Sequence, residues 1–205
     1  MVQIKMCGIK TVNAARWVQE AGAHFMGCIF WSQSRRYVPP ARAKAMVKAT
    51  PKIFHVGVFV DSPAEEINAI ASACSLDYVQ LHGHEPASEA EKIHVPVIKA
   101  YRWGDDFSAI EANTYPAAMV LLDTYNPRKI GGTGNVFPWE AAKEEVAKLQ
   151  KPWFLAGGIR VENAKEAVQT LHPFALDVSG GLEEDGEKTQ AKIKAFMQMC
   201  KQEGL

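Results

Sequence analysis

Two residues that end short apolar runs have side chains that can take up or release a proton. Cys7 ends the run VQIKMC and stands directly before a glycine, and Asp123 ends the run AAMVLLD. A thiolate is the reactive form of cysteine, and a carboxylic acid can donate a proton near neutral pH if its surroundings raise its pKa. Free cysteines are also common as small buried residues. The two are therefore a candidate base and acid if the fold brings them to one site.

Glycines follow the last two apolar runs of the chain. Gly157 and Gly158 come after PWFLA, and Ser179, Gly180 and Gly181 come after FALDV. Glycine lets backbone N–H groups approach a ligand closely, and helix N-termini favour anions. Any tight turn also favours glycine, but two such loops in succession, with a serine hydroxyl between them, predict a phosphate site.

Further polar side chains stand at or just after the ends of other runs. Arg36, in SQSRRY, is placed to clamp a carboxylate or phosphate through two parallel hydrogen bonds, whereas its neighbour Arg35 is expected to be a solvated surface residue. We predict substrate contacts for Gln80, His82 and Asp177. For His82, the residues alone leave two interpretations open, a hydrogen-bonding group in a pocket or a turn residue.

The elements that must position these side chains alternate regularly. Short runs rich in Val, Ile, Phe and Leu are separated by longer stretches, most with apolar residues at three- and four-residue steps, as in surface helices. Successive runs end about 24 residues apart, which suits a strand–helix–strand crossover. The predicted strands are residues 2–7, 25–30, 53–60, 77–81, 95–100, 117–123, 152–156 and 174–179.

Strictly alternating strands and helices predict an α/β fold with a parallel sheet. Eight repeats predict a single-domain (β/α)8 TIM barrel with eight parallel strands over residues 1–205. An open doubly wound sheet is the alternative, but the first strand–helix turn lacks the GxGxxG fingerprint of dinucleotide folds. In a barrel, active groups gather at the C-terminal ends of the strands, so Cys7 and Asp123 are expected to face each other across the mouth.

The composition excludes several classes of protein. Of the 205 residues, 47% are hydrophobic and 22% charged, and the formal net charge is zero. There is no basic arm or stripe, so neither nucleic acid nor an anionic membrane is an expected partner. The longest apolar runs are strand-sized, far below the roughly 20 residues of a membrane helix, and the N-terminus has no signal-peptide pattern.

The cysteines are few and scattered. Cys7, Cys28, Cys74 and Cys200 form no CxxC pair and have no histidine at a ligand spacing, which argues against a metal site. A chain of this length does not need disulfides, so reduced thiols in the cytoplasm are expected.

The motifs together resemble one family, the phosphoribosylanthranilate isomerases of tryptophan biosynthesis. They occur in the family's order from the first strand to the last, so the likeness covers the whole chain. The matching segments are KMCGI (5–9), SRRYV (34–38), VGVFV (56–60), VQLHG (79–83), VIKA (97–100), LLDT (121–124), GGTG (131–134), LAGGI (155–159) and FALDVSGGLE (174–183).

The resemblance implies a barrel that converts N-(5-phosphoribosyl)anthranilate to the carboxyphenylamino-deoxyribulose phosphate, an Amadori rearrangement, without a cofactor. It implies that Cys7 is the general base, that Asp123 is the general acid and that Arg36 contacts the anthranilate end. A small phosphoribosyl substrate is the expected partner, and family members are monomers or homodimers.

The sequence departs from the family pattern at two places. The family often has Ser-Ser-Gly after the Asp-Val of the eighth strand, where this chain has Ser179, Gly180 and Gly181. It often has a basic residue after GGTG, where this chain has Asn135. Both departures concern the phosphate site and leave the acid and the base in place.

Two other functions fit parts of the pattern. Another aldose–ketose isomerase or epimerase acting on a phosphosugar would share the glycine loops but would not need the cysteine base and the aspartate. A catalytically silent barrel that binds phosphoribosyl ligands would be expected to have lost Cys7 or Asp123, and both are present.

Overall fold

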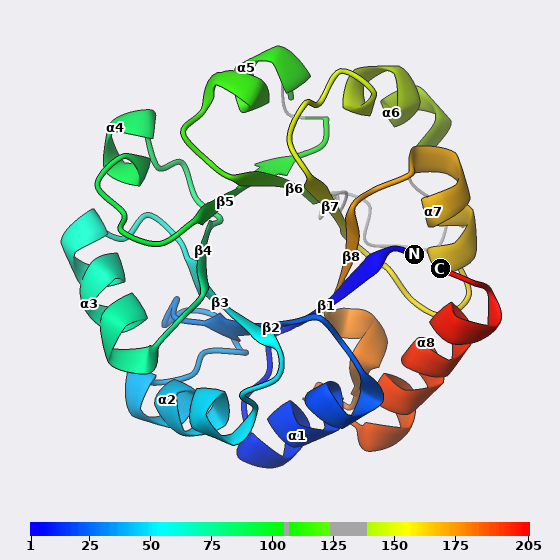
Figure 1. Ribbon diagram of the computed structural model, residues 1–205, viewed down its shortest axis with the longest axis horizontal. Coiled ribbons are helices and arrows are strands. Elements are labelled where there is room, and N and C mark those ends of the chain that lie inside the picture. Colours follow the sequence, from blue (N-terminus) through cyan, green and yellow to red (C-terminus); the bar gives the residue numbers. More distant parts are fainter. Residues whose placement is uncertain (105–106, 124–138) are drawn as a thin grey trace.

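Eight parallel strands close into one barrel in the computed structural model, which describes residues 1–104, 107–123 and 139–205. Each strand pairs with the next in the chain, and the eighth pairs with the first, so the ring seen in Figure 1 has no open edge. This confirms the predicted (β/α)8 fold. The strands are β1 (Gln3–Cys7), β2 (Phe25–Ile29), β3 (Phe54–Phe59), β4 (Tyr78–Leu81), β5 (Val97–Arg102), β6 (Met119–Asp123), β7 (Trp153–Ala156) and β8 (Ala175–Val178).

Helices surround the ring on its outer side (Figure 1). Two stretches predicted as helical form only short helices, four residues in α4 and six in α5. Only Ala90 of α4 is buried, so little tertiary packing holds a longer helix there. The helices are α1 (Val12–Ala21), α2 (Pro40–Ala49), α3 (Ala64–Cys74), α4 (Ala87–Ala90), α5 (Ala109–Thr114), α6 (Trp139–Val146), α7 (Ala164–Leu171) and α8 (Gln190–Gln202).

Side chains of each strand alternate between the helix layer and the barrel interior. On β1, Ile4 and Met6 belong to the large apolar cluster under the helices. Lys5 and Cys7 therefore point the other way, into the barrel, because successive strand residues face opposite sides. A second, smaller cluster fills the interior below the mouth. Its members are Phe25, Val56, Ile98, Ala100, Leu121, Phe154, Ala156 and Ala175.

The segment between β8 and α8 contains structure that the periodicity did not predict. A short 3-10 helix, η2 (Gly180–Leu182), leads into the two-stranded pair β9 (Glu183–Glu184) and β10 (Glu187–Lys188). Each of these strands is only two residues long, too short for an alternation pattern to be recognised. The pair brings Glu183 and Lys188 to the edge of the barrel mouth.

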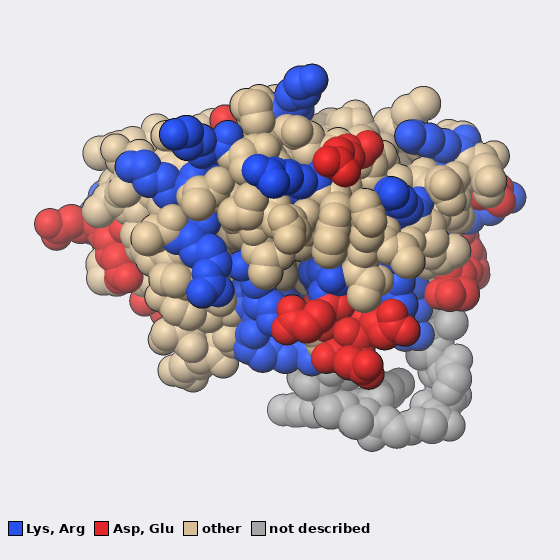
Figure 2. Space-filling view, turned by 90° about the horizontal axis from the view of Figure 1, so that it is seen from below, with Lys and Arg blue, Asp and Glu red and all other residues tan. Residues whose placement is uncertain are grey.

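Three further features concern membrane-spanning helices, the cysteines and the surface charge. Within the described residues, no helix is long and apolar enough to cross a membrane. All four cysteines lie in described segments, and each is buried and free of disulfides. On the face drawn in Figure 2, acidic and basic side chains lie side by side near the lower edge, so the densest charge there is of mixed sign.

Candidate active site

The candidate base and acid stand at the ends of two strands of the same ring. Cys7 ends β1 and Asp123 ends β6, with β7 and β8 between them on the shorter way round. Cys7 is only 6% exposed, whereas the Asp123 side chain is 25% exposed. The two predicted catalytic groups therefore approach the mouth from separate sides, one from a buried position and one from a more open position.

Two glycines make room for Cys7 and for the arginine above it. A Cβ on Gly27, which is paired with Cys7 across β1 and β2, would lie 2.7 Å from the Cys7 sulfur. Gly8 has φ +76°, and a Cβ there would lie 2.5 Å from Cδ of Arg36. The glycine that follows the cysteine is therefore needed both for its backbone conformation and for the path of the Arg36 side chain.

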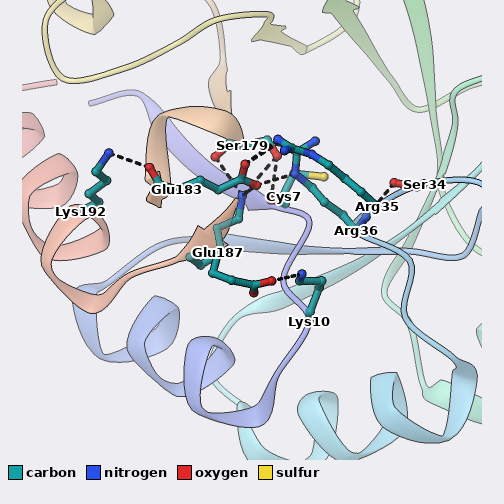
Figure 3. Close-up of polar contacts among 10 residues, drawn as sticks. Cys7, Lys10, Ser34, Arg35, Arg36, Ser179, Glu183, Glu187 and Lys192 are labelled. Atoms are coloured by element: carbon teal, nitrogen blue, oxygen red, sulfur yellow. Dashed lines mark hydrogen bonds and ion pairs between the residues drawn. The ribbon is translucent and has the colours of Figure 1, made fainter. Parts of the chain in front are cut away.

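Arg36 forms a two-pronged ion pair with Glu183. Its Nε donates to Oε1 at 2.5 Å and its Nη2 donates to Oε2 at 2.8 Å. Arg35 also donates to Oε2 at 2.8 Å, although its side chain is 64% exposed. In Figure 3 the two arginines reach from one side toward Glu183, with Cys7 and Ser179 close by. Arg35 is therefore not merely a solvated residue, as predicted from sequence, but part of this cluster.

Lys188 completes the cluster from β10. Its Nζ donates to Glu183 Oε1 at 2.9 Å and to the carbonyl oxygen of Ser179, also at 2.9 Å. The Ser179 hydroxyl in turn donates to the carbonyl oxygen of Cys7 at 3.1 Å. Three cations thus surround one carboxylate beside the proposed base, which leaves a surplus of positive charge suited to an anionic ligand.

The cations around Glu183 also control its titration. Burial acts to raise the pKa of this carboxyl group, but the hydrogen bonds and charges of Lys188 and Arg36 outweigh it and lower the pKa from 4.5 to about 2. For Lys188 the balance is the reverse, since burial lowers the pKa of its ammonium group more than Glu183 raises it.

Glu183→Gln tests this balance through the pH dependence of stability. A carboxyl group with a depressed folded-state pKa stabilises the fold above its unfolded pKa, and this contribution is lost as the pH falls through the folded value. We expect the variant to be on the order of 2 kcal/mol less stable at about pH 6, with the difference shrinking toward about pH 3. Urea unfolding of the wild type and of Glu183→Gln across this pH range measures the difference in their free energies of unfolding. A difference that does not change with pH would contradict the ion-pair account.

The glycine loops after β7 and β8 touch each other. Gly157 and Gly158 have φ +84° and +73°, values that favour glycine, and the space where a Cβ of Gly158 would stand is open. A Cβ on Gly181 would lie 2.4 Å from the carbonyl oxygen of Ile159, so the second loop packs closely on the first. Asn163 fixes the first loop by donating to the Gly158 carbonyl oxygen at 3.0 Å. The two predicted phosphate loops thus form one surface.

Gln80 and His82 lead from the barrel interior toward Asp123. Gln80 is 1% exposed, and its Nε2 lies 2.7 Å from Nδ1 of His82. Nε2 of His82 lies 3.6 Å from Oδ2 of Asp123. These contacts favour the interpretation of His82 as a hydrogen-bonding group in a pocket, which stays a prediction.

A buried ion pair holds the loop that follows His82. Lys99 donates to Glu85 Oε2 and to the carbonyl oxygen of Gly83, both at 2.7 Å, and Glu85 accepts from the Gly83 N–H at 3.1 Å. Both side chains of the pair are almost fully buried. The loop carrying His82 thus starts from a rigid base, which limits how far His82 moves relative to Asp123.

Asp177 does not lie at the open rim. Its Oδ1 accepts a hydrogen bond from Nζ of Lys5 at 3.0 Å, and the residue is 9% exposed. Lys5 is fully buried and was not singled out from the sequence. A signal was present, because Lys5 stands two positions before Cys7 in a buried strand and therefore on the same face. Glu183 and Lys188 were also missed.

Parts of the predicted phosphate site lie outside the described residues. These are the loop GGTG (131–134) and Asn135. Within the described part of the chain, no group of three or more His, Cys, Asp or Glu side chains is placed to hold a metal ion.

Comparisons with known proteins agree with the barrel fold. Residues 4–199 match the family model of N-(5'phosphoribosyl)anthranilate (PRA) isomerase. The N-(5'-phosphoribosyl)anthranilate isomerase of Geobacter metallireducens is 40% identical over 203 residues, 98% of this chain and 100% of that protein. The crystal structure of the Thermotoga maritima isomerase has a TM-score of 0.89 at 37% identity, with each chain covered completely.

A second similar structure carries a ligand. It is a phosphoribosyl anthranilate isomerase in complex with reduced 1-(o-carboxyphenylamino)-1-deoxyribulose 5-phosphate, with a TM-score of 0.86 at 35% identity and complete coverage of both chains. The family model and the relatives extend over nearly all of this sequence, and so does the barrel that they share. The chain therefore belongs to the N-(5'-phosphoribosyl)anthranilate isomerase family.

Proposed function

We propose that the barrel mouth converts N-(5'-phosphoribosyl)anthranilate to 1-(2-carboxyphenylamino)-1-deoxyribulose 5-phosphate, an aldose–ketose isomerisation of tryptophan biosynthesis. The observation that carries this proposal is the placement of Cys7 and Asp123 at two strand ends of one ring, with a cationic cluster beside Cys7. A base and an acid that approach one small molecule from separate sides suit a proton shift within that molecule.

The reaction begins with opening of the ribose ring. Asp123 donates a proton to the ring oxygen as the bond from that oxygen to C1 breaks, and the anthranilate nitrogen supplies its electron pair to form a protonated imine. Cys7 thiolate then removes the proton from C2, and the electrons of that bond form the C1–C2 double bond of a neutral enolamine. Tautomerisation moves the hydroxyl proton to C1 and gives the aminoketone. Proton exchange with solvent restores the thiolate and the acid.

The charge of the site fits a substrate with two anionic ends. Arg36 belongs to the cationic cluster beside Cys7, and in our proposal it takes the anthranilate carboxylate. The loops of Gly157, Gly158, Gly180 and Gly181, together with Ser179, take the phosphate. A Cβ on Gly180 would lie 3.9 Å from Nη2 of Arg36, so the two anionic ends would share the positive field of one cluster. Binding at both ends would orient the reacting carbon between them.

Gln80 and His82 support the acid side. Nε2 of His82 lies 3.6 Å from Oδ2 of Asp123, a contact that we expect to tighten when the substrate binds. Oε1 of Gln80 is buried and has no hydrogen-bond partner among the described residues. A buried acceptor left unpaired costs about 1–3 kcal/mol, which a donor on the substrate would recover. We therefore assign both residues to substrate binding near C1 and the ring oxygen.

Removing Arg36 tests substrate binding. We expect Arg36→Met to raise KM about 10- to 100-fold with a much smaller change in kcat, because a charge-assisted hydrogen-bond pair contributes about 1.5–3 kcal/mol. The matched control is Arg35→Met, which removes the same charge from an exposed side chain of the same cluster. Steady-state kinetics of both variants measure the effect. Equal KM values for Arg36→Met and the wild type would rule out the binding role.

A fluorescence assay tests the reaction itself. Anthranilate, phosphoribosyl pyrophosphate and the preceding transferase generate the labile substrate in the cuvette, and this protein is then added. We expect a rapid fluorescence change and formation of the ribulose phosphate product, confirmed by chromatography. Absence of product at protein concentrations equal to the substrate would refute the proposed function, and turnover of another phosphosugar instead would favour a different isomerase or epimerase.

The oligomeric state and the cellular location remain predictions. The protein is expected to be a monomer or a homodimer, which light scattering after size-exclusion chromatography distinguishes. A cytoplasmic location, with its four cysteines reduced, is expected from the scattered cysteines.

A further inference from the structure

We propose that Lys5 is a positioning residue that stabilises the thiolate of Cys7, and that Asp177 holds its ammonium group in place. This inference rests on the proposed role of Cys7 as the base. It assigns a role in the reaction to a side chain that lies below the mouth and has no path to the substrate.

The strand geometry places the three groups together. Lys5 and Cys7 are two residues apart on β1, so both point into the barrel. Lys5 is paired with Asp177 of β8 in the register of the sheet, and Nζ lies 3.0 Å from Oδ1. Both side chains are buried on the inner face of the same strand, so the ammonium group lies in the immediate surroundings of the Cys7 sulfur. Both strands belong to the closed ring, so these distances cannot relax far.

The burial of Lys5 calls for an explanation. The side chain is fully buried, and removing an ammonium group from water costs several kcal/mol unless partners compensate. Hydrophobic residues of similar volume fill a barrel interior at no such cost, as the neighbouring Phe25 does. A Lys–Asp pair directly beneath the sulfur of the proposed base is a costly arrangement with a direct electrostatic effect on that sulfur.

The charges show the direction of this effect. Burial, the largest influence, raises the pKa of the Cys7 thiol, and Lys5 is the strongest charge opposing it, whereas Asp177 acts to raise the pKa further. Burial also acts to lower the pKa of Lys5, but Asp177 and Cys7 together raise it above 10.5, so the ammonium stays charged. With the thiol protonated, Lys5 and Asp177 cancel each other. When the thiolate forms, it faces a buried cation on the same side of β1.

Other charged or titratable groups face Cys7 from the elements packed around it. Lys188 of β10 lowers the pKa of the Cys7 thiol, and its own charge is neutralised in part by Glu183. Arg36 reaches over the sulfur but is held in the two-pronged pair with Glu183 (Figure 3). Cys28 of β2 is buried, and burial raises the pKa of its thiol so far that it stays neutral. Of these cations in the described part of the chain, Lys5 has its carboxylate partner below the sulfur, whereas Lys188 and Arg36 pair with Glu183 at the mouth.

Two single substitutions should shift the thiol in opposite directions. Lys5→Met removes the cation, so the pKa of Cys7 should rise by about one unit or more. Asp177→Asn is isosteric and leaves an unpaired cation beside the sulfur, so the same pKa should fall by about one unit or more. A merely structural role for the pair predicts no such opposite shifts, because breaking the pair would disturb packing in either variant.

The experiment measures the rate at which iodoacetamide alkylates Cys7 as a function of pH, with the modified peptide quantified by mass spectrometry. The midpoint of this profile reports the pKa of the Cys7 thiol. The pH profile of kcat/KM is measured for the same variants. Lys10→Met is the matched control. Lys10 follows β1 closely in the sequence, but its ammonium group is directed to Glu187, so this variant should leave the pH midpoint of Cys7 alkylation unchanged. If Lys5→Met does not fold, the double variant Lys5→Met, Asp177→Asn removes both buried charges together. Its midpoint should lie above that of Asp177→Asn alone.

The outcomes separate the two proposals. The inference is supported if the alkylation midpoint falls in Asp177→Asn and rises in Lys5→Met. If Lys5→Met does not fold, the midpoint of the double variant should lie above that of Asp177→Asn. Unchanged midpoints, or shifts in the same direction in both single variants, would overturn it. If Cys7 is not the base, the alkylation midpoints would still move in opposite directions, but the kcat/KM profiles would not follow them.

Discussion

Replacing Cys7 by serine should lower kcat/KM by about 10²–10⁴-fold, the usual contribution of a general base. This corresponds to about 3–5 kcal/mol of lost transition-state stabilisation. A serine hydroxyl fits the space that Gly27 leaves, but it does not ionise at neutral pH, so no base remains to remove the C2 proton. Steady-state kinetics by the fluorescence assay give the value, and circular dichroism confirms that the barrel is folded.

Cys74→Ser is the matched control for that substitution. Cys74 is also buried, and its sulfur donates to the carbonyl oxygen of Pro40 at 3.3 Å, a bond that a serine hydroxyl can replace. It lies at the end of α3, in the helix layer. The control should keep the wild-type rate. If Cys7→Ser also turned over at the wild-type rate, the assignment of the base would be wrong.

Replacing Asp123 by asparagine has an effect of similar size, about 10²–10⁴-fold and mainly in kcat. The amide keeps the shape of the side chain near His82 but has no proton to give to the ring oxygen. Asp185→Asn is the control, since it removes a carboxylate from an exposed turn with φ +50°, a conformation that asparagine tolerates. The kinetic measurements are those used for Cys7.

The double variant Cys7→Ser, Asp123→Asn distinguishes a shared mechanism from two separate losses. Groups that act in one reaction sequence are strongly non-additive, so the double variant should be only slightly slower than the slower single variant. If the two losses multiplied fully, the acid and the base would not be acting on the same bound molecule as proposed.

The sequence predicted the eight-stranded ring because short apolar runs and amphipathic helical stretches alternate clearly along it. Alternating apolar runs and amphipathic stretches gave all eight strands in order, with Cys7 and Asp123 at strand ends. The rule that active groups gather at the C-terminal ends of barrel strands then selected Arg36, Gln80 and His82. The short α4 was less predictable, because a helix with one buried residue depends on little more than its own propensity.

The contacts that tune the site could not be read from the sequence. Arg36 and Glu183 are 147 positions apart and Lys5 and Asp177 are 172 apart, so only the closure of the barrel makes them neighbours. The sequence suggested substrate contacts for Asp177, which stay a prediction, but it gave no sign that Asp177 accepts a hydrogen bond from Lys5. Glu183 and Lys188 stand on two-residue strands, where no hydrophobic period marks the fold.

A crystal structure of this protein with the reduced product tests the central claim most directly, because that ligand keeps both anionic ends and the carbons that react. We predict that the Cys7 sulfur lies within about 4 Å of C2 and that the Asp123 carboxylate bonds the oxygen released from the ring. The phosphate should rest on the loops of Gly158 and Gly181. A ligand bound in the mouth with C2 out of reach of the sulfur, or with Asp123 on the same side of the sugar as Cys7, would contradict the account.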